Sequence, residues 1–246
     1  MKPLLLLAAL LATSTAFAQT TIDQNKALAG NVTPGDAPGF PIRISQPGSY
    51  KLTSSLIVPA DTNGIEVAAH NVTLDLNGFT ISGAITCTGS GAGLVCTGGQ
   101  GDGVISYAAR GTTVRNGTVT GFYRGVVLGA NALVEQLRVV HNGTVGLSLT
   151  QTNAVVDGGN FSSNGSVGIV SGSIGILMRN LTASGNRWIG IQSFHGSSVQ
   201  GVIASHNGTY GMQGGHVGAS VLADNGTNNL NTSYSMGNNL CSASLC

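Results

Sequence analysis

Charged side chains are scarce in this chain. Asp, Glu, Lys and Arg make up 8% of its 246 residues, and the formal net charge is +1. The Lys and Arg residues are scattered, so the sequence has no basic stripe suited to nucleic acid. It also lacks the amphipathic basic helix that lies on membrane surfaces. We therefore expect no nucleic-acid partner.

Long apolar runs are scarce too, and the one clear run lies near the start of the chain. Lys2 precedes an apolar run over residues 4–11, and Ala16-Phe17-Ala18 has the small-x-small form of a cleavage site. These features predict a secretory signal peptide over residues 1–18. No other apolar run approaches the length of a membrane span. We expect a secreted or periplasmic protein without a membrane span.

Cysteine is limited to four residues, which fall in two close pairs. Cys87 and Cys96 bracket one short segment, and Cys241 and Cys246 bracket another. An even number of cysteines in an exported chain predicts disulfides, here one within each pair. Neither spacing is C-x-x-C and no His lies close to either pair, which disfavours a metal site at the cysteines.

Glycine and aliphatic residues are abundant by contrast, and the glycines recur at a fixed interval. The chain has 38 Gly, and 41% of its residues are apolar, which favours packed strands over disorder. A glycine followed by an apolar residue recurs at spacings of 22, 21, 22, 22 and 21, at Gly103, Gly125, Gly146, Gly168, Gly190 and Gly211. An Asn-Gly or Gly-Asn pair runs in phase with these glycines, so the chain is built of repeats.

The repeat also explains the stretch "VTLDLNGFTISG" at residues 72–83, which has the Asn-Gly signal of a hairpin. Gly64-Ile65 precedes Gly103-Val104 by 39 residues, one period plus about 17. The surplus fits residues 84–101, which contain Cys87 and Cys96. We therefore interpret residues 72–83 as one corner of a coil that carries a disulfide-pinned loop, and not as a hairpin.

A period near 22 with strand-type residues predicts an all-β solenoid of parallel strands. Each repeat holds about three short apolar runs, so a three-faced coil is expected, with Gly and Asn at corners because they tolerate positive φ. We expect about seven coils over residues 64–226. An N-terminal segment with cap strands, residues 19–63, would precede them, and a C-terminal tail, residues 227–246, would follow.

The stretch "PGSYKLTSSLIVP…NGIEVAAHNVTLDLNGFTISG" and the coils after it resemble a known family. They resemble the single-stranded right-handed parallel β-helix repeat proteins of the pectin-lyase-like group, over roughly residues 40–226. The resemblance implies a right-handed parallel β-helix in an exported protein. Characterised members of that group are mostly polysaccharide lyases, hydrolases and epimerases, so the resemblance implies architecture more than activity.

One column of charged residues recurs 10 to 12 residues after the coil glycines. Its members are Asp75, Arg115, Glu135, Asp157 and Arg179, followed by Gln200, with Arg138 nearby. One interpretation is a surface ladder of ion pairs on adjacent strands. The other is a groove for an acidic or neutral glycan, in which the arginines hold carboxylates or hydroxyls.

The residues needed for the group's known chemistries are incomplete in this column. Calcium-assisted lyases need clustered carboxylates, because calcium takes six to eight oxygen ligands. Hydrolases need a pair of carboxylates as acid and base, and the chain has no adjacent Asp pair. If the protein is catalytic, the candidates for acid–base roles are Arg115, Glu135, Asp157 and Arg179.

Histidine and aromatic residues supply the remaining candidates. His195 and His216 lie at the same offset in adjacent coils, as two metal ligands without an evident third or as polar corner residues. Tyr123, Trp188 and Tyr210 lie one or two residues before a coil glycine, which predicts a shared edge. Such rings either stack on sugars or shield the backbone at a corner. The glycan-binding candidates are therefore Arg138, Trp188, Tyr210 and Arg187.

Two functions remain open on these residues. The first is an exported, non-catalytic β-helix that binds glycan or cell-surface polysaccharide, or that acts as a structural scaffold, and it needs no cofactor. The alternative is a small polysaccharide lyase or uronate epimerase that acts in a groove along the coils, with calcium if it is a lyase. The sequence carries no signal for an oligomeric state.

Overall fold

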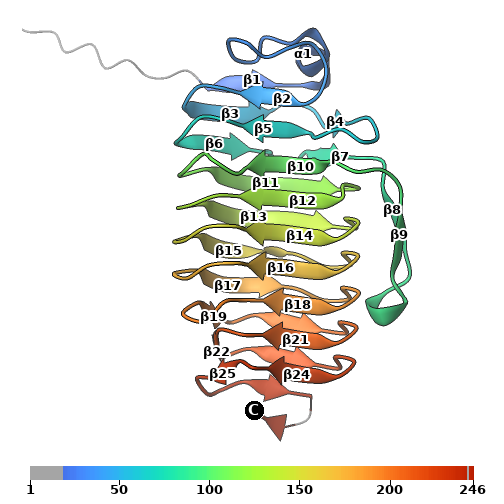
Figure 1. Ribbon diagram of the computed structural model, residues 1–246, viewed down its shortest axis with the longest axis vertical. Coiled ribbons are helices and arrows are strands. Elements are labelled where there is room, and N and C mark those ends of the chain that lie inside the picture. Colours follow the sequence, from blue (N-terminus) through green and yellow to red (C-terminus); the bar gives the residue numbers. More distant parts are fainter. Residues whose placement is uncertain (1–18, 243) are drawn as a thin grey trace, which may run out of the picture.

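The computed structural model describes residues 19–242 and 244–246, so the predicted signal peptide lies outside the described residues. Over the described part, the chain winds into a parallel β-solenoid of about nine turns (Figure 1). This confirms the all-β solenoid that the repeat predicted. Two sheets run along the rod, and the side chains between them form one continuous core.

Each turn contributes one strand to a nine-stranded parallel sheet over the described residues. In spatial order, its strands are β2 (Ile42–Ile44), β5 (Ile65–Val67), β10 (Asp102–Ser106), β12 (Arg124–Leu128), β14 (Val145–Leu149), β16 (Val167–Ser171), β18 (Ile189–Gln192), β21 (Tyr210–Gln213) and β24 (Asn228–Asn231).

The second sheet has sixteen strands over the described residues and covers the other two faces. Its main path is β1 (Thr20–Ile22), β3 (Gly48–Leu52), β6 (Val72–Asp75), β11 (Thr113–Thr120), β13 (Leu133–Val140), β15 (Val155–Asn160), β17 (Leu177–Thr182), β20 (Ile203–Ser205), β23 (Val221–Ala223), β26 (Leu240–Cys241) and β27 (Ser244–Leu245). Beside this path lie β4 (Leu56–Ile57), β7 (Thr80–Ser82), β19 (Ser198–Gln200), β22 (His216–Gly218) and β25 (Tyr234–Ser235).

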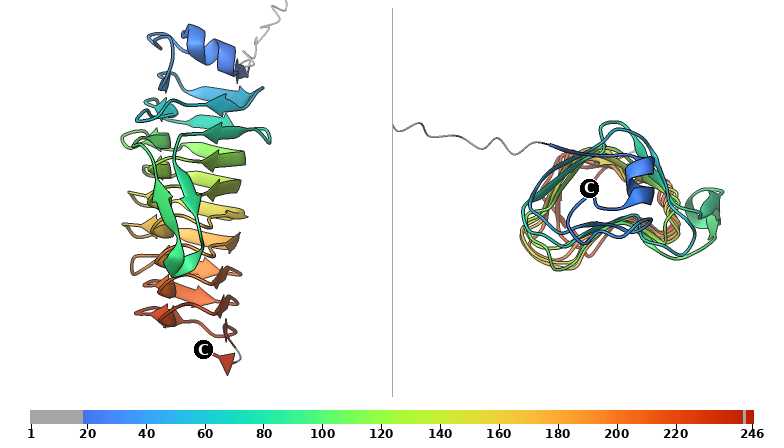
Figure 2. Two further views of the ribbon diagram at one scale, coloured as in Figure 1. Left: turned by 90° about the vertical axis from the view of Figure 1, so that its right-hand side faces the viewer. Right: turned by 90° about the horizontal axis from the view of Figure 1, so that it is seen from above.

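A bend inside the long strands gives each turn its third face. Asn116 in β11 and Gln136 in β13 adopt φ of 57° and 48°, and Asn180 in β17 adopts 57°. A left-handed residue in mid-strand redirects the chain, so the two halves of each strand belong to different faces. The end-on view in Figure 2 shows the closed outline that results.

The expected number of seven coils is too low, and the reason lies at both ends of the rod. Ile42 pairs with Ile65, and Leu230 pairs with Met212, so residues on either side of 64–226 also form turns. In these outer turns the landmark glycine is replaced by Pro41 and Asn229. The repeat pattern therefore fades in the sequence before the fold ends.

The stretch at residues 72–83 is a corner, as predicted. Strand β6 pairs with β3 and β11, and β7 pairs with β4 and β11, always in parallel. Asn77 and Gly78 between them both have positive φ. The register also pairs Ile65 with Val104, which confirms that the segment between these turns is an insertion.

Five asparagines, four of them buried, form a ladder along the inside of one corner. From the second member onward, the Oδ1 of each asparagine accepts hydrogen bonds from the backbone N–H and the Nδ2 of the asparagine one turn earlier, at 2.9–3.2 Å. The members are Asn142, Asn164, Asn186, Asn207 and Asn225. The first four are at most 2% exposed, so the ladder satisfies polar groups that water cannot reach.

The ladder corrects the expected corner geometry. These asparagines are not the positive-φ residues, because the residue before each of them takes that conformation: His141, Ser163, Gly185, His206 and Asp224, with φ of 54–65°. The asparagine side chain is thereby turned inward. The Asn-Gly landmark in the sequence thus marks an internal hydrogen-bond position and not a solvated turn.

The coil glycines were also expected at corners, and they lie instead within the nine-stranded sheet. Gly168 in β16 has no positive φ, but a Cβ there would stand 2.5 Å from the carbonyl oxygen of Phe161 and 2.8 Å from the Nδ2 of Asn186. Gly190 meets the Nδ2 of Asn207 in the same way, also at 2.8 Å. Close approach of the ladder amide is therefore what requires glycine.

The insertion folds into an arm that lies along the outside of the asparagine corner (Figure 2). Strands β8 (Thr86–Thr88) and β9 (Val95–Thr97) pair antiparallel, with the 3₁₀ turn η1 (Gly91–Gly93) at the tip. The predicted Cys87–Cys96 disulfide joins the two strands, and the predicted Cys241–Cys246 disulfide closes the C-terminal hairpin of β26 and β27. At the tip, the Gly91 N–H donates to the carbonyl oxygen of Gly185 at 3.0 Å.

A short helix, α1 (Gln24–Ala29), lies across the N-terminal end of the rod (Figure 2). Asp23 caps it by accepting from the Lys26 N–H at 2.8 Å, and Ala27 is fully buried.

Within the described residues, no helix has the length and apolar character needed to cross a membrane.

The ladder predicts the effect of removing one of its members. Replacing Asn186 by Ala leaves the Asn164 N–H without its acceptor and removes the donor to the Phe161 carbonyl oxygen, while the Asn164 Nδ2 keeps its bond to the Val139 carbonyl. We expect a loss of about 1–3 kcal/mol in the free energy of unfolding for each buried group left unpaired, measured by urea denaturation. Asn228→Ala, at an exposed position of β24, is the matched control. Equal stabilities for the two variants would contradict the role of the ladder.

The packing of the glycines predicts a second difference. Gly168→Val places a side chain against the Phe161 carbonyl and the Asn186 amide, and overpacking of this kind costs at least about 1–3 kcal/mol. Gly172→Val is the control, because a Cβ at Gly172 has no neighbour closer than 4.0 Å. Thermal melting should separate the two variants clearly, and a wild-type midpoint for Gly168→Val would refute the packing argument.

Candidate functional site

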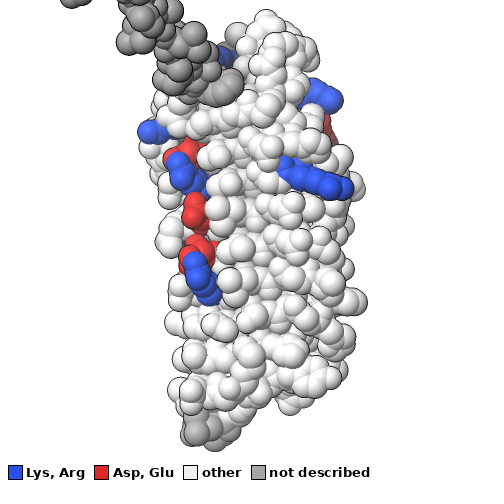
Figure 3. All heavy atoms as spheres, turned by 90° about the vertical axis from the view of Figure 1, so that its left-hand side faces the viewer, with Lys and Arg blue, Asp and Glu red and all other residues white. Residues whose placement is uncertain are grey.

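The register of the sixteen-stranded sheet places the charged column side by side on consecutive turns. Asp75 pairs with Arg115, Arg115 with Glu135, Glu135 with Asp157, Asp157 with Arg179, and Arg179 with Gln200. Figure 3 shows these side chains as a single file on one face, and the described residues farther down the same face show no charged side chain there. The counted offsets predicted this order correctly.

Two copies of one small arrangement occupy most of the column, and the first joins the turns of β6 and β11. The Oδ2 of Asp75 accepts from the Nε of Arg115 at 3.2 Å, and its Oδ1 accepts from the Nδ2 of Asn116 at 3.4 Å. Asp75 Oδ1 also accepts from the backbone N–H of Asn77 at 2.9 Å. An aspartate on one turn is thus held by an Arg-Asn pair on the next.

The second copy joins β15 and β17. The Oδ2 of Asp157 accepts from an Nη of Arg179 at 2.6 Å, and its Oδ1 accepts from the Nδ2 of Asn180 at 3.2 Å. The hydrogen bond from Arg179, aided by the one from Asn180, holds the pKa of the Asp157 carboxyl below its usual range. The same bond raises the pKa of the Arg179 guanidinium.

The turn between these two copies, which contributes β13, does not share the Asp/Arg-Asn arrangement. Within residues 19–242 and 244–246, no hydrogen bond or ion pair engages the side chains of Glu135 or Gln136. Arg115 is turned toward Asp75, and Asp157 is committed to Arg179. Glu135 and Asp157 are therefore like charges opposite each other on neighbouring strands, an arrangement that costs stability.

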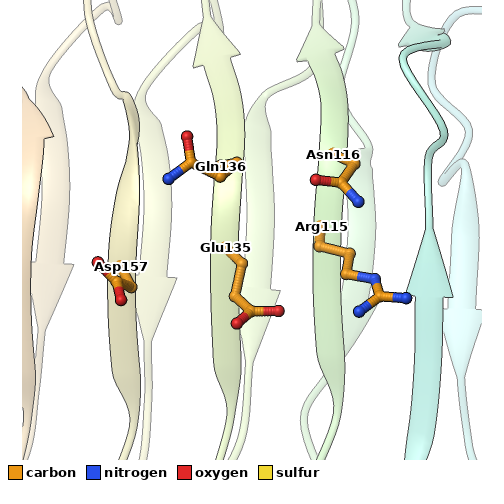
Figure 4. Close-up of a pocket in the computed structure, with 5 residues that line it drawn as sticks. All are labelled: Arg115, Asn116, Glu135, Gln136 and Asp157. Carbon is orange, nitrogen blue, oxygen red and sulfur yellow. The ribbon is translucent and has the colours of Figure 1, made fainter.

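A hollow of about 220 Å³ lies at this turn, lined by Arg115, Asn116, Glu135, Gln136 and Asp157. Figure 4 shows Arg115 leaning away from Glu135 and Gln136 leaning toward β15. Gly158 on β15 makes room for Gln136, because a Cβ at Gly158 would collide with the Gln136 amide. The hollow is therefore shaped by side chains from three consecutive turns.

The hollow offers both donors and acceptors. The Nη groups of Arg115 and the amide of Gln136 can donate, while the carboxylates of Glu135 and Asp157 can accept. Hydroxyl groups, which donate and accept at once, match such a lining. No cluster of three or more His, Cys, Asp or Glu residues that could hold a metal ion occurs in the described part of the chain.

The other predicted glycan contacts lie elsewhere. Arg138 lies past the bend of β13, exposed between Thr118 and Asn160 on neighbouring strands. Trp188 is 56% exposed, and exposed Arg187 precedes it on the asparagine corner. None of these three residues lines the hollow.

The aromatic edge is only partly shared. Backbone hydrogen bonds run from Thr144 to Tyr123, from Ser166 to Thr144, and from Trp188 to Ser166, so Tyr123 and Trp188 occupy one column three turns apart. Tyr210 pairs with Ile189 instead, one residue along. The predicted edge therefore holds for two of its three rings.

The two candidate histidines are not equivalent positions, which corrects the count of offsets. His216 pairs with Ser198, three residues beyond His195. The ring of Tyr234 contacts both histidine rings, with centroid distances of 6.2 Å to His195 and 5.2 Å to His216.

One ion pair was missed by the sequence reasoning. Arg124 donates to both carboxylate oxygens of Asp102, at 2.8 and 2.6 Å, and its guanidinium lies 5.5 Å from the centroid of the Tyr107 ring. The hydrogen bond to Asp102, which is only 5% exposed, raises the pKa of Arg124. The spacing of the two residues could have predicted this ion pair, because Asp102 and Arg124 directly precede the coil glycines Gly103 and Gly125, which are one period apart.

Comparison with known proteins adds no assignment to this site. No family model, no curated protein sequence and no solved structure matches the chain at a significant level.

The Asp157–Arg179 pair predicts a titration result. Arg179→Ala should raise the pKa of the Asp157 carboxyl toward the ordinary value of about 3.9, as followed by NMR of the carboxyl carbon. Because the folded-state pKa is lowered, the stability from this pair is present above the unfolded pKa and is lost as pH falls through the folded pKa.

The melting midpoint of Arg179→Ala near neutral pH should stay close to that of the wild type, because both partners are solvent-exposed. Arg138→Ala removes a positive charge from β13 without touching the pair, so Asp157 should titrate as in the wild type. A large fall in the midpoint, or an unshifted Asp157, would overturn the ladder interpretation.

Proposed function

We propose that this protein is an exported, non-catalytic β-solenoid that binds a glycan or cell-surface polysaccharide at the hollow around Glu135 and Gln136. One observation carries the proposal. The column satisfies its charges in two Asp/Arg-Asn arrangements, and the turn between them keeps a carboxylate and an amide unengaged. Glu135 and Gln136 depart from the Asp/Arg-Asn arrangement without forming another stabilising contact. Departures of this kind are expected where surface residues bind a ligand.

The lining of the hollow supports a polyhydroxylated ligand. Its residues come from three strands, so it spans two strand spacings, roughly 10 Å, enough for a short stretch of sugar units. The two carboxylates and one guanidinium leave no excess positive charge, so a strongly acidic polymer is a poor match. A neutral or weakly charged glycan is the ligand that this mixture fits best.

The sequence and the disulfides support export. Residues 1–18 have the pattern of a signal peptide, and the two disulfides fit an oxidising compartment outside the cytoplasm.

The geometry weighs against the lyase or epimerase alternative. A lyase base must lose its proton, whereas the ion pair raises the pKa of Arg179. A general acid must hold its proton, whereas hydrogen bonds lower the pKa of Asp157. Calcium needs six to eight oxygens, and the hollow presents the carboxylates of Glu135 and Asp157 beside a guanidinium.

A glycan array on the mature protein, read with and without calcium, tests the proposal. We expect binding of at least one polysaccharide, and a loss of roughly tenfold in affinity for the double variant Glu135→Gln, Gln136→Asn, which removes a charge and shortens an amide. Lys51→Gln, in the same column but outside the hollow, should bind as the wild type does.

The same preparations are assayed for the ultraviolet absorbance of unsaturated uronate. Binding without product supports the proposal. A rise in absorbance that Arg115→Ala or Arg179→Ala abolishes would establish the enzyme instead. Absence of binding to every polysaccharide would contradict the proposal and favour a scaffold.

A further inference from the structure

The corners of the rod change length toward its C-terminal end. The segments between β16 and β17 and between β18 and β19 are five residues long, whereas those between β21 and β22 and between β24 and β25 have two. The first of the short corners is Gly214-Gly215, with φ of 74° and 70°. Two left-handed glycines turn the chain without side chains, and we call this change from five-residue to two-residue corners the step.

Four rings line this step. His195, on the last long corner, contacts Phe194 at a centroid distance of 5.9 Å and reaches Tyr234, two turns away, at 6.2 Å. The two rings can approach each other because the corner of the intervening turn is Gly214-Gly215, which has no side chains. Tyr234 also lies against His216, at 5.2 Å and an interplanar angle of 36°. The result is a continuous row of rings across three turns.

A recess of about 230 Å³ lies at the same step, lined by Gly196, Ser197, Ser198, His216 and Met236. The apolar groups around it are unusually open to solvent, since Phe194 is 49%, Met236 48% and Tyr234 60% exposed. Residues 188–246 contain a single charged residue, Asp224, whose carboxylate lies 3.8 Å from His206 on the asparagine corner. The recess thus combines ring faces, hydroxyls and imidazoles without a charged carboxylate or cationic chain.

We propose that this recess, together with the row of rings that adjoins it through His216, is a second carbohydrate site that binds a neutral pyranose unit. A sugar ring has one apolar face of C–H groups and a rim of hydroxyls. The His216 ring in the recess and the Tyr234 ring beside it match the first, and Ser197, Ser198 and the His216 imidazole match the second. Sites of this composition, mostly apolar with a few placed polar groups, are typical of small-molecule binding.

This site rests on the proposed function only in expecting carbohydrate, since it shares no residue with the hollow at Glu135. The two differ in the sugar they fit. The hollow holds charged groups that engage hydroxyls, whereas the recess selects an uncharged ring by stacking. A polysaccharide end or branch, and not an internal acidic unit, is the chemistry that the recess suits.

The test uses isotope-labelled mature protein and NMR, with methyl glucopyranoside, methyl galactopyranoside and methyl mannopyranoside as neutral probes, glucuronate as an acidic probe and indole as an apolar probe. We expect at least one neutral glycoside to shift the signals of the Tyr234 and His216 rings. Glucuronate should shift them far less. Shifts with indole alone would overturn the proposal in favour of a site for an apolar side chain.

Single substitutions test whether the neutral glycoside binds at the recess. Tyr234→Ala should weaken the neutral glycoside by roughly five- to tenfold, the effect of losing one stacking ring. Ile203→Ala, which removes a 46% exposed apolar side chain from another face, is the matched control and should change nothing. Equal affinities for wild type and Tyr234→Ala would overturn the site.

The Glu135→Gln, Gln136→Asn variant separates the two proposals. If it binds the glycosides at the recess as the wild type does, the recess acts on its own, whatever the array shows for the hollow. If no probe shifts the recess while the array still shows Glu135-dependent binding, the recess proposal fails and the proposed function stands.

Discussion

The interlock of one buried asparagine with one glycine holds this fold together. The amide of each ladder asparagine bonds to the next turn and fills the space where the Cβ of a coil glycine would stand, as Asn186 does over Gly168. An unpaired amide at this depth is costly, so each turn must lie in register with the next. The ladder sets the register and not the length of a turn, because its members lie 21 or 22 residues apart as far as Asn207, whereas Asn207 and Asn225 meet at a separation of 18.

That fixed register converts sequence spacing into columns on the outer faces, and the columns carry the chemistry. Asp75 and Asp157 are each held by an Arg-Asn pair one turn on, in which the guanidinium offsets the charge and the amide adds a hydrogen bond. Glu135 and Gln136 interrupt this pattern, and the hollow lies at their turn. The interruption is recognisable because the turns on either side of it show how the same positions form hydrogen-bonded ion pairs.

The outer surfaces of the corners are free of this constraint, and they vary. On the asparagine corner, small residues next to the ladder admit the disulfide-pinned arm. On the opposite side of the nine-stranded sheet, five-residue corners give way to Gly214-Gly215, and the step gathers Phe194, His195, His216 and Tyr234 around a recess. The rod thus has a charged column in its N-terminal half and an uncharged, ring-lined surface in its C-terminal half.

The sequence by itself determined the solenoid, its period, the pairing of Ile65 with Val104 across the insertion and the charged column, because in a parallel stack a constant spacing along the chain becomes adjacency in space. It also determined both disulfides, because the four cysteines fall in two pairs that are close along the chain. It did not reveal the outer turns, where Pro41 and Asn229 replace the glycine. It also misplaced His195 opposite His216, because counting offsets assumes corners of equal length. Only the tertiary structure decided which corners are short, and therefore which rings meet, since the corner that varies in length carries no asparagine ladder that would record its position in the repeat.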